Sequence, residues 1–385
     1  MFLGGEARYL PLNVIFLNKK IYVAKESNLY DKSLLGHEIL SINDKNPLQL
    51  VNELGELFAS DGFIKAVKFS DLNGFLFSKH HFLKYGFINE YDIEIKNSNG
   101  STNRLKLKSQ TLTDFRNSLV ANEKRKTNKE SLEFRILNDT IAYLGVHTFS
   151  NSQYKQNEIH KNLSKFLEIS FKTIEESKIN NLIVDVSNNG GGNEGNENLL
   201  FSYIADNYKK YESVCAKSQV SVLDNGIDKP IKLKTFGLFE RIFANDKMTD
   251  GSYCRKPNKG FGLMAYKKEP KYKYNGKLFV IISPITYSGG SEFSNMIKTS
   301  NRGIFIGEET GGGYYGNTSG YSSELVLPHS GLLIDIPSLK FEMNVQNGEF
   351  GRGVIPDFIV IPTIEEYLAG EEIPIEFIVD GKASR

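Results

Sequence analysis

The pattern with the clearest chemical meaning in this chain is a serine between an apolar segment and a pair of glycines. Ser288 follows the apolar residues 278–282 and precedes Gly289 and Gly290, so the spacing predicts a buried strand that turns into a helix at the serine. N–H groups at a helix start have no intrahelical partner and can stabilise developing negative charge. We therefore predict that Ser288 is a nucleophile. For this segment alone, the alternative is a serine that only caps the helix.

Three further glycine-containing segments strengthen the interpretation of Ser288 as a nucleophile. Residues 181–193 form an apolar strand pattern that ends in polar residues and three adjacent glycines. Residues 303–313 again read as a strand followed by a glycine turn, and residues 351–357 contain a third such turn. Adjacent glycines at a strand end indicate unusual backbone angles or the close approach of another group.

Taken in this order, the four segments resemble the C-terminal processing (tail-specific) serine peptidases and their relatives, the tricorn core protease and interphotoreceptor retinoid-binding protein. The resemblance covers about residues 139–362, and the strand 141–149 is similar to the one that enters the family's catalytic core. It implies hydrolysis of peptide bonds through an acyl-enzyme. Ser288 matches the family's nucleophile, and Gly289 and Gly191 match the glycines whose amides form the oxyanion hole.

The chain departs from the tail-specific branch at the general base. That branch carries a lysine shortly after Gly-Glu-x-Thr, where this chain has Gly313, and no lysine occurs between Lys298 and Lys340. A serine without a base is a poor nucleophile at neutral pH because its proton has no acceptor. The tricorn-like branch uses a histidine from a segment that precedes its peptide-binding domain, and no histidine precedes His37 here.

His147 is the best internal candidate for the base because it lies on the strand that enters the core. The alternative is a histidine that alternates onto one face of a strand without a catalytic role. His80 and His81 are interpreted as part of a helix or loop surface, with paired metal ligation as the alternative. Glu308 and Glu309 are interpreted as solvated carboxylates beside a turn, with orientation of a base or binding of a substrate amine as the alternative.

The missing lysine leaves a second function open, that of a catalytically impaired family member that only binds peptides. An intact Ser288 aligned with two oxyanion glycines favours catalysis, since binding alone does not require both. Nucleotide binding is rejected, because the glycine turns lack the Lys-Ser/Thr ending of a P-loop and the Gly-x-Gly-x-x-Gly pattern. No cofactor or metal is expected, and Cys215 and Cys254 lie in no Cys/His cluster.

The recurrence of strand, glycine turn and helix at residues 181, 277 and 303 predicts an α/β fold. The resemblance implies a crotonase-like (ClpP/crotonase) core. Apolar spacing predicts a packing helix within 154–179 and a second helix at 198–204. The insertion at about 209–274, rich in lysine and aromatic residues, is interpreted as a solvated excursion, with a substrate-facing wall or lid as the alternative.

The first hundred residues predict a separate β-rich unit. Residues 12–17 and 20–24 alternate in hydrophobicity across a short polar turn, as in a hairpin. Residues 36–43 resemble a strand of a PDZ domain, although 59–86 is longer than that fold requires. PDZ domains add an extended peptide to a sheet edge and capture its carboxylate. The resemblance places this capture at residues 8–12. The alternative is a unit that only packs against the core.

The sequence predicts four parts of the chain. They are a PDZ-like domain at 1–112, a linker at 113–133, the peptidase core at 134–366 and a C-terminal tail at 367–385.

Composition limits the remaining possibilities. The 385 residues are enough for about two or three domains, and a net charge of +1 gives no basic field, so we expect no nucleic acid partner. No apolar run approaches the roughly 20 residues that span a bilayer. Residues 1–16 show no signal peptide, whereas the resemblance implies the cell envelope, the periplasm or secretion. The expected partner is a peptide or an unfolded protein. The two cysteines allow one disulfide bridge. The sequence does not determine the oligomeric state.

Overall fold

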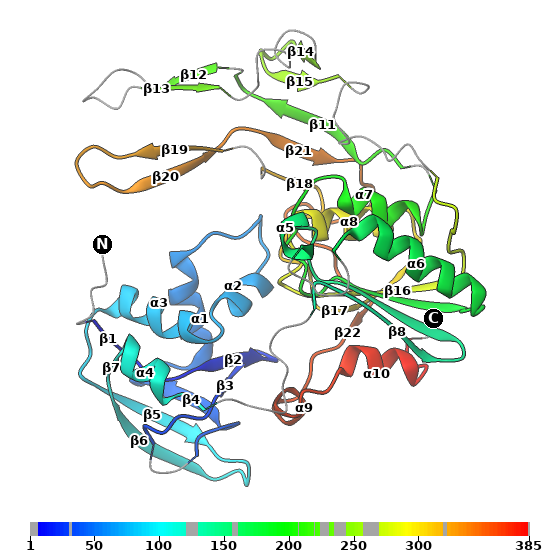
Figure 1. Ribbon diagram of the computed structural model, residues 1–385. Coiled ribbons are helices and arrows are strands. Elements are labelled where there is room, and N and C mark those ends of the chain that lie inside the picture. The colour runs from blue at the N-terminus through cyan, green and yellow to red at the C-terminus, as the bar shows by residue number, and fades with distance from the viewer. Residues whose placement is uncertain are drawn as a thin grey trace. The chain divides into compact units, whose positions relative to one another are not determined.

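The computed structural model describes residues 7–30, 33–120, 130–155, 161–206, 208–218, 220–223, 231–234, 244–256, 269–318 and 322–383. The chain divides into two compact units (Figure 1). The first unit combines residues 1–129 with 306–308 and 357–385, and the second combines 130–305 with 309–356. Parts of the predicted linker and insertion, at 121–129, 224–230, 235–243 and 257–268, lie outside the described residues.

A mixed sheet carries the glycine turns that the sequence singles out. Among the described residues its strand order is β22-β17-β16-β10-β9-β8, and β10 pairs in parallel with both β9 and β16. These central strands are almost continuously apolar, as expected where both faces of a parallel sheet are buried. The strands are β8 (Leu132–Asn138), β9 (Ile141–Val146), β10 (Asn181–Asp185), β16 (Lys277–Ile282), β17 (Ile304–Gly307) and β22 (Phe358–Ile359).

Helices pack against one face of this sheet (Figure 1). Alternate strand residues such as Leu144, Val184 and Val280 share a core with Phe166 and Phe293 of the helices. The two helices predicted within 154–179 and at 198–204 are present as α6 and α7, and α6 begins at an Asn162 cap. The helices are α5 (Asn151–Tyr154), α6 (Leu163–Glu176), α7 (Asn196–Ser202) and α8 (Gly289–Thr299).

The described part of the predicted insertion belongs to a second sheet, with the order β14-β15-β11-β21-β18. Tyr211, Val214 and Ala216 of β11 are buried, so this strand is packed and not the solvated excursion that the sequence indicated. Cys215 and Cys254, directly opposite each other on β11 and β15, form a disulfide. The strands are β11 (Tyr211–Ala216), β14 (Asn245–Lys247), β15 (Tyr253–Arg255), β18 (Gly316–Asn317) and β21 (Lys340–Met343), with separate hairpins β12 (Val220–Leu223) with β13 (Ile231–Lys234) and β19 (Ser322–Val326) with β20 (Leu333–Pro337).

The first unit contains an antiparallel sheet in the order β2-β3-β4-β5-β6. The predicted hairpin is confirmed as β2 and β3, and its turn residues Asn18 and Lys19 both have positive φ, as a two-residue hairpin turn requires. The elements are β1 (Arg8–Tyr9), β2 (Val14–Leu17), β3 (Lys20–Val23), β4 (Glu38–Ile42), α1 (Pro47–Leu54), the 3-10 turn η1 (Gly55–Leu57), α2 (Ala66–Asp71), α3 (Phe75–Tyr85), β5 (Glu90–Lys96), β6 (Thr102–Lys108), β7 (Gln110–Thr111), α4 (Leu112–Ser118), α9 (Ile364–Ala369) and α10 (Ile373–Val379).

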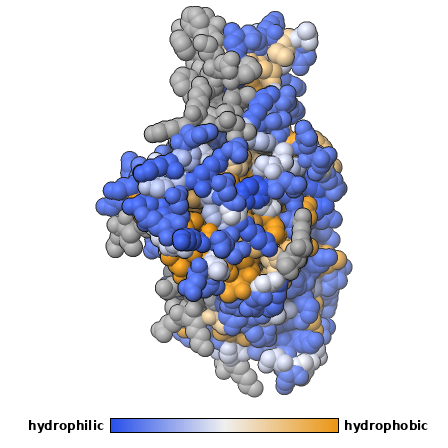
Figure 2. Space-filling model, turned by 90° about the vertical axis from the view of Figure 1, so that its right-hand side faces the viewer, coloured by the Kyte–Doolittle hydropathy of each residue, from blue (hydrophilic) through white to orange (hydrophobic). Residues whose placement is uncertain are grey.

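The exposed surface is mostly hydrophilic on the face that Figure 2 shows, with hydrophobic side chains gathered in a few areas. Apolar side chains on part of the surface are ordinary for folded proteins. Within the described part of the chain, the helices are too short or too polar to cross a membrane. The segment predicted as a C-terminal tail contains α10.

Candidate active site

Ser288 lies in the turn that joins β16 to α8, immediately before the helix begins at Gly289. Its backbone has φ 48° and ψ −124°, a conformation that residues other than glycine rarely adopt. Its side chain is partly exposed and makes no capping hydrogen bond. Strained backbone of this kind persists only where the surroundings hold it, and it is concentrated at functional sites. The geometry therefore favours a reactive serine over a capping serine.

The surrounding glycine segments hold this turn in place. Tyr287 N donates to the backbone oxygen of Asn189 at 3.0 Å, and Gly312 N donates to Thr286 O at 3.1 Å. A Cβ on Gly290 would lie 2.3 Å from Asn189 O, so only glycine allows this approach. The turn after β16 is thus fixed by the turns that follow β10 and β17.

Ser288 and Gly191 meet although they are far apart in the sequence. A Cβ placed on Gly191 would lie 2.6 Å from Ser288 Cβ, 2.9 Å from Ser288 Oγ and 3.0 Å from Gly289 N. Gly191 also has φ +99°, which favours glycine. The structure therefore brings together Ser288, Gly289 and Gly191, three of the four residues that the sequence proposed for the site.

The two backbone amides proposed for the oxyanion hole differ in their hydrogen bonding. Gly289 N heads α8 and has no hydrogen-bond acceptor among the described residues. Gly191 N donates to Asn189 Oδ1 at 2.9 Å, and Asn189 Nδ2 in turn donates to Val146 O at 2.9 Å. Asn189 is fully buried, so its side-chain amide is fixed. A substrate can therefore accept a hydrogen bond from Gly191 N only if it displaces Asn189 Oδ1. The sequence did not predict this internal hydrogen bond.

His147, the proposed base, contacts Tyr143 on its own strand. Its Nε2 is 3.3 Å from the hydroxyl of Tyr143, which donates to Asp185 Oδ2 at 2.8 Å. Positions 143, 145 and 147 alternate onto one face of the strand, and Gly145 leaves room for the imidazole. No hydrogen bond joins His147 to Ser288, whose Oγ has no hydrogen-bond partner among the described residues. The structure thus shows no hydrogen bond between the two residues, and the role of His147 as the base stays a prediction.

Substitution of His147 tests its proposed role as the base. We expect His147→Gln to react with a serine-directed fluorophosphonate at close to the wild-type rate, because the imidazole does not contact the hydroxyl. The second-order rate of labelling at neutral pH is the measurement. A decrease of about a hundredfold or more, as loss of a general base produces, would identify His147 as the base.

Glu309 has a structural role that the sequence did not indicate. Its carboxylate accepts two hydrogen bonds from the Arg352 guanidinium, both at 2.8 Å, and one from Gly353 N at 2.9 Å. A bidentate pair of this kind fixes geometry as well as charge. It joins the glycine segment 303–313 to the segment 351–357. Glu309 is therefore not the solvated carboxylate that the sequence favoured.

His80 and His81 lie on α3 and do not form a metal pair. His80 Nδ1 is 2.7 Å from the Leu76 carbonyl oxygen one turn earlier. His81 is buried against Tyr85 and Tyr91, and burial lowers the pKa of His81 to about 4, so the ring is neutral near pH 7.

A buried ion cluster behind the nucleophile was missed by the sequence reasoning. Lys210 Nζ lies 2.6 Å from carboxylate oxygens of both Glu197 and Glu292, and the lysine side chain is fully buried. Tyr211 Oη and Asn317 Nδ2 donate to Glu292 Oε1 at 2.9 and 3.0 Å. The cluster therefore joins α7, α8, β11 and β18 at one buried point.

The cluster adjoins the first turn of the nucleophile helix. Glu292 lies one turn after Ser288 and its N–H donates to Ser288 O, while a Cβ on Gly289 would lie 3.6 Å from Glu197 Oε2. Burial opposes the charge of Lys210, but the two carboxylates raise the pKa of Lys210 well above its usual value. Lys210 is therefore a permanent cation that positions α8 and is unsuited to act as a base.

The sequence and fold place the chain in a known family. A family model described as peptidase family S41 matches residues 140–360, more than half of the chain. The chain therefore belongs to peptidase family S41, and the predicted membership of the C-terminal processing peptidases is confirmed. A search of curated proteins found no match.

Two solved structures of CPAF share the fold. Mature CPAF superposes with a TM-score of 0.59 at 14% identity, covering 98% of this chain and 81% of that one. CPAF in complex with lactacystin gives a TM-score of 0.55 at 14% identity, covering 98% and 82% of the two chains. At this identity the similarity shows a common fold.

Proposed function

We propose that this chain is an active serine peptidase that cleaves peptide bonds through an acyl-enzyme on Ser288. The observation that carries the proposal is the convergence of Ser288, in its strained backbone conformation, with Gly191 and with the amide of Gly289. Ser288 Oγ would bond to the scissile carbonyl carbon, and the C–N bond would break as the tetrahedral adduct collapses. The hydroxyl proton would pass to the nitrogen, which would leave as an amine. Water would then release the acyl group.

The free Gly289 amide would stabilise the oxyanion, with the Gly191 amide joining it after leaving Asn189. Each such donor contributes on the order of a hundredfold to a thousandfold in turnover. Among the described residues no imidazole or amine hydrogen-bonds to Ser288, so the proposal assigns no base. Catalytic hydrogen bonds often form only when substrate is bound.

Covalent labelling tests this function. Incubation of the wild-type chain with a fluorophosphonate, followed by peptide mass spectrometry, is expected to locate the adduct on Ser288. Hydrolysis of unfolded protein substrates should be lost in proportion to labelling. An adduct at another serine would remove Ser288 from the mechanism.

A specific observation favours the second candidate function, peptide binding without cleavage. Ser288 Oγ lacks a described partner and the Gly191 amide is occupied by Asn189, as expected of an impaired site. A chain that binds peptides but neither labels nor cleaves would establish this function and overturn the first.

We also propose that the chain has a crotonase-like core and a PDZ-like domain. The parallel strands β9, β10 and β16, each linked to glycine turns or helices, support a crotonase-like core. The antiparallel sheet and helices of the first unit support a PDZ-like domain, and the predicted boundaries at 112, 133 and 366 stay predictions. We propose a peptide or unfolded protein as the partner, in agreement with the family.

The disulfide supports an exported location, the cell envelope, the periplasm or the exterior, because such bridges persist in oxidising compartments. The bridge closes a loop of 39 residues. Replacing both Cys215 and Cys254 by alanine is expected to lower the free energy of unfolding by about 2–4 kcal/mol, measured by urea denaturation. Equal midpoints for the wild type, the variant and the reduced wild type would contradict a stabilising bridge.

A further inference from the structure

The loop that follows Gly191 is held against the start of helix α5. Phe149 N donates to Gly191 O at 2.8 Å, and Asn193 N donates to Phe149 O at 2.9 Å. Asn151 N donates to Asn193 Oδ1 at 2.8 Å. These hydrogen bonds fix the backbone of the loop up to the residue before Glu194. Glu194 therefore has a defined position close to the proposed oxyanion hole.

Glu194 lies within reach of a substrate side chain. Gly191 is beside Ser288, since a Cβ on this glycine would lie 2.9 Å from Ser288 Oγ. Glu194 follows Gly191 at the third position, and three residues of extended chain span at most about 11 Å. The side chains of glutamate and of a long substrate residue each bridge part of this distance. A residue that flanks the scissile bond can therefore contact the Glu194 carboxylate.

Unlike its neighbours, the Glu194 carboxylate has no hydrogen bond or ion pair with a described residue, and its side chain is exposed. Glu197 and Glu292, by contrast, share the ammonium group of Lys210. Glu197 also accepts a hydrogen bond from Gly195 N at 3.0 Å. The buried lysine is thus already used by two carboxylates, and Glu194 is available to a cation from outside the chain.

The surroundings of Glu194 place its ionisation near neutral pH. Although the side chain reaches solvent, partial loss of hydration against the surrounding protein raises the pKa of Glu194 to about 7. The cations Lys210 and Arg255 oppose this rise in pKa, and the carboxylates of Glu197 and Glu292 add to it. A bound cation favours the charged form of a carboxyl group, so binding of a basic group and ionisation of Glu194 are coupled.

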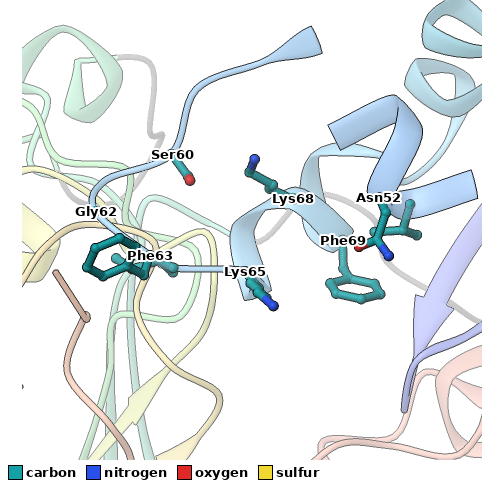
Figure 3. A pocket seen from close by; sticks show the side chains of 9 residues that line it. Asn52, Ser60, Gly62, Phe63, Lys65, Lys68 and Phe69 are labelled. Carbon is teal, nitrogen blue, oxygen red and sulfur yellow. The ribbon is translucent and has the colours of Figure 1, made fainter. Parts of the chain in front are cut away.

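The first unit contains a cavity of the opposite charge (Figure 3). Its volume is about 270 Å³, and Lys65 and Lys68 lie between Phe63 and Phe69 in this view. None of the described residues that line it carries a carboxylate. Two lysines repel a basic side chain, so this cavity does not offer an alternative site for it.

We propose that Glu194 determines specificity by binding a lysine or arginine side chain of the substrate next to the scissile bond. The inference rests on the proposed function in taking a peptide as the substrate and Ser288 as the centre of the site. A charge-assisted hydrogen bond gives a carboxylate a preference for such a side chain over an uncharged one of similar length. Glu194 thus selects where a chain is cut and takes no part in breaking the bond.

Matched peptides test this preference. A peptide that the wild type cleaves is acetylated at its amino end, so that its amine is not a second cation. Lysine or glutamine is then placed at each of the two positions before and after the cleaved bond. At one of these positions we expect kcat/KM to be about tenfold higher with lysine, because a hydrogen bond between charged groups is worth about this factor.

Variants of Glu194 locate the effect. Glu194→Gln should abolish the preference for lysine, and Glu194→Lys should reverse it in favour of glutamate at the same position. Glu212→Gln is the matched control, since Glu212 is an exposed carboxylate on β11 that is paired with Lys209. A preference for lysine that persists in Glu194→Gln would overturn the proposal, and so would its absence from the wild type at every position.

The pH dependence separates direct contact from a structural effect of the substitution. Glu194 is charged above its pKa of about 7 and neutral below it, so the preference for lysine should be present at higher pH and lost as the pH falls through about 7. The ratio of the two kcat/KM values is measured, because effects of pH on the reaction itself are common to both peptides. This transition should be absent in Glu194→Gln, and a ratio that does not change between pH 5.5 and 8.5 would contradict the assignment.

The two proposals fail separately. If Ser288 reacts with fluorophosphonate and lysine and glutamine peptides are cleaved equally, the Glu194 proposal alone is wrong. If Ser288 never reacts, fluorescence anisotropy with the Ser288→Ala chain still measures binding of acetylated, labelled peptides that contain lysine or glutamine. Tighter binding of the lysine peptide that depends on Glu194 would support the cation site without the hydrolytic function, whereas equal binding would overturn both.

Discussion

Ser288→Ala is expected to abolish labelling by a serine-directed fluorophosphonate and to lower peptide hydrolysis by roughly a millionfold. The reason is chemical, because the acyl-enzyme needs the Ser288 oxygen, which lies at the head of α8 beside Gly191. Alanine removes only that oxygen. The folded structure should therefore remain, as circular dichroism and thermal unfolding can verify.

Ser294→Ala provides the matched control for this experiment. Ser294 lies on the same helix, is fully buried, and donates to Gly290 O at 2.9 Å. Its variant should label like the wild type. Residual labelling of Ser288→Ala, or loss of labelling in both variants, would show that the reactive group has been assigned wrongly.

Lys210→Met is expected to lower the free energy of unfolding by about 3–5 kcal/mol, because it leaves the carboxylates of Glu197 and Glu292 buried without their cation. Such a loss is a large part of the stability of most domains. Since Glu292 belongs to the first turn of α8, the rate of Ser288 labelling should fall as well. Urea denaturation and labelling of the still folded variant are the two measurements.

Lys209→Met separates a buried cation from a lysine at the surface. Lys209 is the neighbouring residue, and its ion pair with Glu212 is exposed, so its loss should change stability by about 0.5 kcal/mol or less. Similar losses in the two variants would contradict the special role of the buried cluster. A stable Lys210→Met variant with a normal labelling rate would do the same.

Local pattern was sufficient to find the nucleophile turn and much of the fold. The apolar segment before Ser288 and the glycines after it already specify a strand, a turn and a helix. The hairpin of β2 and β3 and the helix α6 follow from alternation and from helical spacing in the same way. Gly191 was assigned from the resemblance to the family, and the structure places it beside Ser288.

Contacts between distant segments could not be predicted. Lys210 and Glu292 are separated by 82 positions, and neither has a local pattern that marks it as buried, since most lysines and glutamates are exposed. The surroundings of His147 show the same limit. Its place on the strand that enters the core suggests a base, but the contact of its Nε2 with the Tyr143 hydroxyl at 3.3 Å could not be predicted from that position.

The hydrogen bond between Gly191 N and Asn189 Oδ1 has a consequence for discrimination between ground state and transition state. A neutral substrate carbonyl gains little by displacing a neutral side-chain amide, because one ordinary acceptor merely replaces another. An oxyanion accepts a hydrogen bond about twice as strongly. Under the proposed mechanism this donor is therefore recruited only as negative charge develops, so its contribution raises turnover without tightening the binding of unreacted peptide.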